Sequence, residues 1–216
     1  MEFTREQAIN IAIRCAKEYK RKLSNTRLFV VYRDRESNNI MALEVLFRPS
    51  NFQHLTGLIM VDENGQEKKG CAKEFYNRCL SKPFITSDEI RFKNDGTTLL
   101  KLGALPSIMD FTKITKICGD YNNAKSNLEA DAIVGGVNFS LAISRYESDK
   151  EEFFPRSALM EDIRNLVKNA SQVLAIFQKP INSTDKYSDI KYVAKGVDIQ
   201  KINLPEAISS MIELAD

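Results

Sequence analysis

The feature of the sequence that most constrains the fold is a pair of β-rich segments near the N-terminus. Residues 28–32 and 40–47 are rich in valine, leucine and phenylalanine, and Ser37, Asn38 and Asn39 lie between them. Branched and aromatic residues on both sides of a polar, turn-favouring segment are typical of a β-hairpin. A hairpin commits the chain to antiparallel pairing from its first strands, so the fold must contain a sheet.

The rest of the sequence mixes strand-like and helical segments. Short β-rich segments are predicted at residues 58–61, 89–92, 117–121, 132–135, 139–146, 173–178 and 190–194. Helices are predicted over residues 73–80 and 98–109. A further helix is expected to begin after Ser157, as its N-cap, and to run to about residue 169.

Helices are also predicted at both ends of the chain. Thr4 and Gln7 form a capping-box pattern that opens a helix over residues 4–23, with alanine and isoleucine at three- and four-residue steps. A short helix is predicted over residues 204–214. Because the sequence contains no repeat or linker-like tract, we predict one domain of residues 1–216. Its expected fold is α+β, an antiparallel sheet flanked by helices.

The composition is that of an ordinary globular domain, and it does not indicate which kind of molecule the protein binds. Of the 216 residues, 43% are hydrophobic and 28% are charged, and the formal net charge is only +2. The first 35 residues are different, because they contain nine Lys or Arg and four Asp or Glu, a local net charge of +5. This basic end is either a solvated helix face or a surface for an anionic ligand or RNA.

The compartment is predicted to be the cytoplasm. The N-terminal segment is charged throughout, so no signal peptide is expected. No apolar run approaches the roughly 18 residues that a membrane span needs, so no membrane association is expected. The cysteines form no CxxC pair, which favours free thiols in a reducing environment: Cys15, Cys71, Cys79 and Cys118.

A single histidine limits the chemistry. With only His54, the chain can build neither a multi-histidine metal site nor a histidine pair for acid–base catalysis, and we expect no metal and no cofactor. Walker, Rossmann, HExxH and GxSxG motifs are absent. His54 itself is expected in a loop leading to a strand, beside Thr56 and Gly57. It is either a structural histidine or a functional one with a short hydroxyl donor and an accessible backbone beside it.

A second candidate segment, residues 153–157, reads FFPRS. Its simplest interpretation is the start of a helix, with Ser157 as the cap. A cap does not account for Arg156 behind a rigid proline, and Arg156 together with a helix N-terminus would suit a phosphate group.

Several motifs resemble those of a phage-associated nuclease-like family. Residues 52–58 read FQHLTGL, similar to the family's HLTG signature, and residues 154–164 read FPRSALMEDIR, similar to its Pro-x-Ser-x-Leu and Asp-Ile motif. Intervening segments follow in a similar order: residues 72–76, Lys101-Leu102 and Gly119-Asp120-Tyr121. The family is the fourth PBECR group, named for phage proteins resembling barnase, EndoU, colicin and RelE nucleases. The resemblance covers about residues 40–192, and Arg156 stands where a small polar residue is expected.

The resemblance implies a BECR-like nuclease fold and metal-independent RNA cleavage, in which the ribose 2′-OH attacks the neighbouring phosphate. Such a reaction needs a base, an acid and positive charge near the phosphorane. His54 is the candidate acid or base, because its unperturbed pKa is about 6.5. Lys101 and Arg156 are candidates for stabilising negative charge, and Thr56 and Ser157 for orienting the phosphate. The second proton carrier would be a carboxylate, Tyr or Lys, or would be missing.

Three functions stay open. The first is an endoribonuclease of a phage or mobile element, acting as a toxin on RNA and opposed by an inhibitor protein. The second is a non-catalytic member of the same fold that binds a nucleotide, RNA or a protein partner, and the even charge balance favours it. The third is a structural or protein-interaction domain in which His54 and Ser157 only make local hydrogen bonds. If the candidate residues lie together in one cleft, the first two functions are favoured and the third is excluded.

Overall fold

The computed structural model describes residues 3–147 and 152–214. It opens with helix α1 (Arg5–Lys22), and the predicted capping box is present. The Thr4 hydroxyl accepts the Gln7 N–H, and the Thr4 N–H donates to the Gln7 side chain. One face of α1 is buried, so its apolar stripe packs on the core: Ala8, Ile9, Ala12, Cys15, Ala16 and Tyr19.

The elements after α1 follow the predicted mixture of strands and helices. Strands β1 (Thr26–Arg33) and β2 (Ile40–Phe47) form the predicted hairpin. The middle of the chain contributes α2 (Asn51–Thr56), β3 (Ile59–Met60), α3 (Ala72–Leu80), η1 (Ser87–Glu89), β4 (Ile90–Arg91), α4 (Thr97–Ile108) and α5 (Phe111–Ile114). The remainder contributes β5 (Ile117–Asp120), β6 (Ala132–Gly135), β7 (Ser140–Arg145), β8 (Glu152–Leu159), η2 (Ile163–Asn165), β9 (Ser171–Pro180), β10 (Asp189–Val193), η3 (Ile199–Lys201) and α6 (Glu206–Ser209).

The main sheet is closed, which corrects the expectation of a simple antiparallel sheet. Its strand order is β1-β2-β8-β7-β6-β5-β9-β10, and β1 also pairs with β9. Seven of the described strands therefore form a barrel, and β10 extends it from β9. The α+β class is correct. Closure was not predictable from periodicity, because it depends on pairing between residues 26–33 and 172–180, which lie far apart in the sequence.

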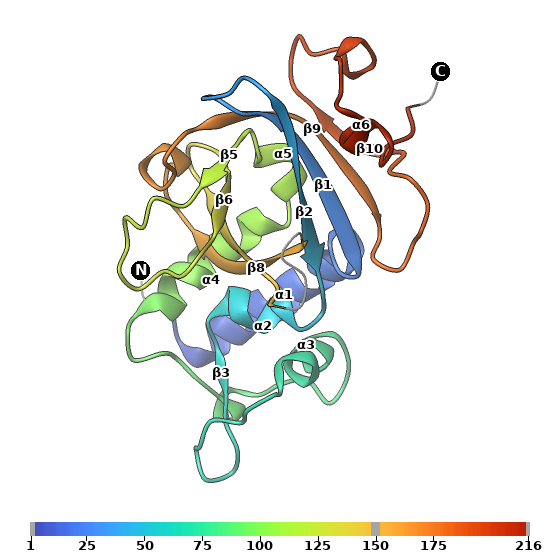
Figure 1. The fold of residues 1–216 in the computed structure, drawn as a ribbon. Helices are drawn as coiled ribbons and strands as arrows, with labels where there is room; N and C mark the ends of the chain where they lie inside the picture. The colour runs from blue at the N-terminus through green and yellow to red at the C-terminus, as the bar shows by residue number, and fades with distance from the viewer. Residues whose placement is uncertain (1–2, 148–151, 215–216) are drawn as a thin grey trace.

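One pair in the barrel is parallel and short. Among the described residues, strands β2 and β8 pair at Glu44 with Glu152 and at Val45 with Phe153. Beyond this contact β2 ends and leads into α2, and both α2 and α4 pack against β8. Figure 1 shows α4 and α5 within the curve of the sheet, with α1, α2 and α3 gathered toward one end of it. The edge of β8 is therefore covered by helices where a strand would otherwise continue.

Three apolar clusters hold these layers together. The largest joins the helices to one face of the sheet and includes Tyr19, Phe47, Phe52, Phe75 and Phe111. A second cluster packs the C-terminal segment on the opposite face of β1 and β9, where the Phe29 and Tyr187 rings stack at a centroid distance of 5.0 Å. The third cluster joins η2 to β6 and β7.

Two local predictions were wrong. Residues 157–169 do not form a helix, because residues 153–159 pair with β7 as part of β8, and only the single turn η2 follows. His54 lies in a helix, α2, instead of a loop leading to a strand. The C-terminal helix is present but shorter than residues 204–214. None of the described helices combines the length and apolar character needed to cross a bilayer.

Gly119 in β5 marks a close approach between two backbone segments. A Cβ atom at this position would lie 2.3 Å from the Asn169 carbonyl oxygen and 3.1 Å from the Val167 Cβ. Neither neighbour is a flexible side-chain end, so a methyl group there would force β5 away from the segment before β9. This steric requirement accounts for the glycine in the Gly119-Asp120-Tyr121 motif.

We predict that Gly119→Ala lowers the free energy of unfolding by roughly 1–3 kcal/mol, the usual cost of overpacking. Gly103→Ala in α4 is the matched control, because a Cβ atom there meets nothing within 4 Å. The control is expected to be neutral or to stabilise the protein by up to about 1 kcal/mol, since alanine is the better helix former. Urea unfolding followed by circular dichroism measures both. Equal stability of Gly119→Ala and wild type would contradict the steric account.

Candidate functional site

The His54 side chain is presented on the outer face of the short helix α2. The Arg48 N–H donates to the Asn51 Oδ1 atom (2.7 Å) at the start of this helix, while Phe52 and Leu55 are buried in the core. His54 lies between these two buried positions and is exposed. Core packing of one helix face therefore fixes the direction of the imidazole on the other.

Thr56 and Gly57 end this helix. The Thr56 side chain is completely buried, and its hydroxyl donates to the Gln53 carbonyl (2.7 Å) and accepts the Leu58 N–H (3.0 Å). Gly57 has a φ of +70°, the left-handed conformation that glycine adopts without strain. In this structure the Thr56 hydroxyl bonds to the backbone that carries His54.

Gly57 also allows α4 to pack closely. A Cβ atom on Gly57 would lie 3.0 Å from Lys101 Cδ and 3.1 Å from Thr98 Cα. The buried Thr98 hydroxyl donates to the Gly57 carbonyl (2.8 Å) and accepts the Lys93 N–H (2.9 Å). Thr98 thus ties the end of α2 to α4 and to the loop after β4, a role that the sequence analysis did not identify.

Lys101 brings a cation beside His54. Its Nζ atom donates to the His54 carbonyl oxygen at 3.0 Å, and its aliphatic stem lies against Gly57. Partial burial, together with the positive charges of Lys93 and Arg156, lowers the pKa of Lys101 to about 8. A measurable fraction of this amine is therefore neutral close to physiological pH.

The same group of cations acts on His54. Although the side chain is exposed, surrounding atoms displace part of its water, and this desolvation is the main reason that the His54 pKa lies below its ordinary value. The charges of Lys101, Arg156 and Lys93 lower the pKa further. The imidazole is therefore mostly neutral at pH 7 and able to accept a proton.

Arg156 reaches this group from a bulge in β8. Ala142 pairs with Ser157 and Ile143 pairs with Pro155, so Arg156 has no opposing residue on β7. Bulges of this kind redirect a side chain and are frequent beside active sites. The Arg156 Nη2 atom lies 2.7 Å from the Glu129 Oε2 atom, in a pair whose side chains are 44% and 85% exposed. Such an exposed pair is weak and can exchange for another anion.

Ser157 takes a different position from the one expected. It lies within β8, opposite Ala142, and is buried, so it caps no helix. The structure brings together His54, Lys101 and Arg156, from α2, α4 and β8, and adds Lys93. These four residues are called the cationic cluster below. Thr56 and Ser157 are buried beside it.

The cationic cluster is suited to an anion. Its side chains come from four segments and interact electrostatically, as the pKa changes of His54 and Lys101 indicate. Residues 3–147 and 152–214 contain no group of three or more His, Cys, Asp or Glu side chains placed to hold a metal ion. The four cysteines all lie in these ranges, and they are buried thiols without disulfide bonds.

Comparison with known proteins identifies one family. The sequence model described as phage-Barnase-EndoU-ColicinE5/D-RelE like nuclease4 matches residues 13–195. The match confirms the resemblance found in the motifs and extends it to most of α1 and to the β1–β2 hairpin, beyond the 40–192 core. No curated protein and no solved structure matches the chain.

The single histidine allows the electrostatics of the site to be measured directly. We predict that the His54 imidazole titrates below its ordinary pKa in wild type, and that Lys101→Met raises this pKa because one neighbouring positive charge is lost. Methionine retains an unbranched apolar stem against Gly57. The measurement is an NMR titration of the His54 ring protons.

Lys113→Met is the control for this titration, because Lys113 on α5 is mostly exposed and pairs with Asp110. Its replacement is expected to leave the His54 pKa unchanged. An unaltered His54 pKa in Lys101→Met would show that the two groups are not coupled.

Proposed function

The chain belongs to the phage-Barnase-EndoU-ColicinE5/D-RelE like nuclease4 family, and on this premise we propose that it is a metal-independent endoribonuclease. The observation that carries the proposal is the convergence of His54, Lys101 and Arg156 from three separate elements. A neutral imidazole among fixed cations matches what phosphodiester cleavage by a ribose hydroxyl requires.

In the proposed reaction, the 2′-oxygen forms a bond to the adjacent phosphorus, and the bond from phosphorus to the 5′-oxygen breaks. The 2′-OH proton passes to His54, whose lowered pKa keeps the imidazole free to accept it. Lys101, with a pKa of about 8, donates a proton to the departing 5′-oxygen. The products are a 2′,3′-cyclic phosphate and a free 5′-OH.

The remaining residues stabilise charge and position. Arg156 and Lys93 balance the negative charge that develops on the phosphorane oxygens. Arg156 reaches the phosphate by leaving Glu129, which is a small cost for an exposed ion pair. Thr56 holds the end of α2 and so fixes the direction of His54, and Ser157 supports the bulge that presents Arg156.

A second candidate is a non-catalytic module that binds a nucleotide, RNA or a protein. The observation that favours it is that both cations already have partners: Lys101 bonds the His54 carbonyl, and Arg156 pairs with Glu129. This arrangement is as compatible with ligand binding as it is with catalysis. For either candidate we propose a phage or mobile-element setting and action in the cytoplasm. For the catalytic form we also propose RNA as the substrate, toxin activity and an inhibitor protein.

Cleavage of labelled RNA in EDTA tests the proposal. Wild type is expected to produce 2′,3′-cyclic ends, and His54→Ala is expected to lower kcat by roughly 10²- to 10⁴-fold, the usual contribution of a general base. Lys113→Met serves as the surface control and should cleave like wild type. RNA that is bound but not cleaved by wild type would favour the second candidate, and equal rates in wild type and His54→Ala would remove His54 from the mechanism.

The pH dependence of kcat/KM is expected to be bell-shaped. Activity should rise with pH as the His54 imidazole loses its proton, with a midpoint below the ordinary histidine value. It should fall again with a midpoint near the Lys101 pKa of about 8, because the neutral amine no longer supplies a proton or a charge. Lys101→Met should lower the maximum and remove the alkaline limb. An alkaline limb that persists in this variant would assign it to another group.

A further inference from the structure

A pocket of about 410 Å³ opens beside the cationic cluster. Its walls are Ile59 of β3, Glu67 of the following loop, and residues 91–95 at the end of β4 and beyond. The volume lies within the range of roughly 300–1,000 Å³ that small-ligand pockets occupy. Lys93 belongs both to this wall and to the cationic cluster, so the two features are contiguous.

Hydrogen bonds fix the pocket relative to His54. The Lys93 N–H donates to the Thr98 hydroxyl, which donates in turn to the carbonyl of Gly57, three residues after His54. The Thr98 side chain is completely buried, which protects both bonds from water. These hydrogen bonds therefore connect the backbone at the pocket wall to the backbone that follows His54.

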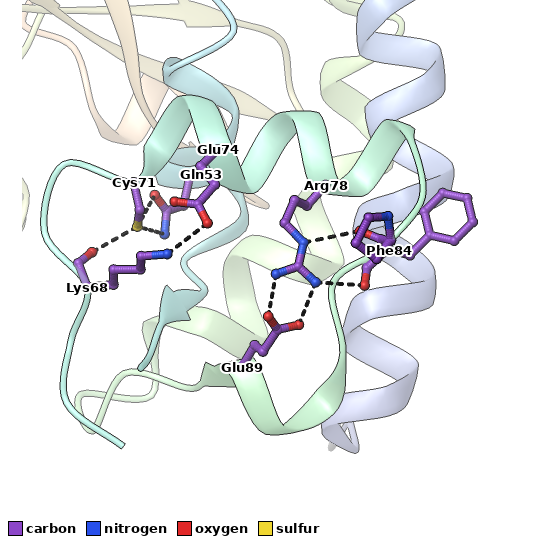
Figure 2. A network of polar contacts seen from close by, with 8 residues as sticks. Gln53, Lys68, Cys71, Glu74, Arg78, Phe84 and Glu89 are labelled. Atoms are coloured by element: carbon purple, nitrogen blue, oxygen red, sulfur yellow. Dashed lines mark hydrogen bonds and ion pairs between the residues drawn. The ribbon is translucent and has the colours of Figure 1, made fainter. Parts of the chain in front are cut away.

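A polar network around α3 connects the segment before β4 to α2. Figure 2 shows the Arg78 side chain of α3 bonded to the Glu89 carboxylate and to the Phe84 carbonyl. Glu89 directly precedes β4, whose Ile90 and Arg91 pair with β3. Figure 2 also shows Gln53 of α2 in contact with Cys71, the residue before α3. These contacts join the β3–β4 pair to the helix that carries His54.

The chemistry of the pocket differs from that of the cationic cluster. Arg91 and Lys93 are balanced by Glu67 and Asp95, and Arg91 lies 3.5 Å from Glu67 in an ion pair. The Asp95 Oδ1 atom accepts the Thr97 N–H (3.0 Å) and hydroxyl (2.7 Å), which holds the carboxylate in place. A wall with balanced charges and polar side chains suits a neutral ligand with its own donors and acceptors better than it suits a phosphate.

Phe92 supplies the apolar surface of the pocket. Phe92 is half-buried: it packs against the core and also lines the pocket. Aromatic rings held in this way stack on nucleic-acid bases, whatever their identity, because every base has a π-face.

We infer that this pocket receives one unpaired base of an RNA strand, stacked on Phe92, while the neighbouring phosphate lies on Lys93, Lys101 and Arg156. The inference rests on the proposed function, because the phosphate at the cationic cluster is the scissile one. A base held in a duplex cannot enter the pocket, so the substrate class is single-stranded RNA.

Binding without cleavage tests the pocket. The probe is a fluorescein-labelled, single-stranded 2′-O-methyl RNA octamer, in which the attacking hydroxyl is blocked. A second probe has the same backbone without bases. Phe92→Ala is expected to weaken binding of the first probe by about five- to 150-fold, the usual effect of losing one stacked base, with no change for the second probe.

Phe84→Ala is the matched control, because Phe84 is a half-buried phenylalanine of the same region that does not line the pocket. It should bind both probes like wild type. Circular dichroism checks folding, and Phe92→Leu, which keeps an apolar contact with the core but has no flat ring, replaces Phe92→Ala if that variant unfolds. The same weakening of both probes by Phe92→Ala, or no weakening of either, would overturn the inference.

A parallel cleavage assay on unmodified RNA keeps the two proposals separate. Phe92-dependent binding of the base-containing probe supports the pocket even where wild type fails to cleave, in which case the nuclease proposal alone falls. Cleavage that depends on His54, together with binding that is indifferent to Phe92, overturns the pocket and leaves the nuclease proposal standing. A duplex of the same octamer should bind much more weakly than the single strand.

Discussion

The site depends on the short parallel contact between β2 and β8. Glu44 and Glu152 lie opposite each other in this contact, and Arg27 of β1 bridges them at 3.4 Å and 3.2 Å. Without that cation, two half-buried carboxylates would repel each other where β2 and β8 meet. Because no described pair of β2 and β8 follows Val45 and Phe153, the rest of the β8 edge is free for α2 and α4. The β2–β8 contact is thus one link in the ring of strands that β1 and β9 close, and beside it the helices that carry His54 and Lys101 pack on β8.

Gathering like charges opposes folding, and the fold offsets this with hydrogen bonds. His54 and Lys101 both have lowered pKa values, which means that each proton binds less tightly to the folded protein. The Lys101 amine is compensated by the His54 carbonyl, and the loop carrying Lys93 is held by the Thr98 hydroxyl. Side chains with strongly perturbed pKa values are found most often at functional sites. In the adjoining pocket the charges are of opposite sign, as in the Arg91–Glu67 pair, so they do not repel each other in this way.

Local patterns predicted the local structure. The capping box at Thr4, the β1–β2 hairpin and the helices α3 and α4 follow from periodicity and turn chemistry. Closure through β1 and β9 did not, because it depends on contacts between distant segments. His54, Lys101 and Arg156 were predicted as candidates from residue type and motif, whereas Lys93 and Thr98 become candidates only through packing of α4 on α2. The one local signal for Lys93 was its position just before the Asn94-Asp95-Gly96 turn that leads into α4.

The small net charge of the chain is compatible with RNA as a ligand. Net charge governs long-range attraction and non-specific affinity, whereas a scissile phosphate is held by the few cations within reach of it. Lys93, Lys101 and Arg156 provide this local charge on a protein whose overall balance is only +2. In the proposed complex, the charge-balanced pocket would add affinity through an unpaired base, a contribution that is largely independent of charge.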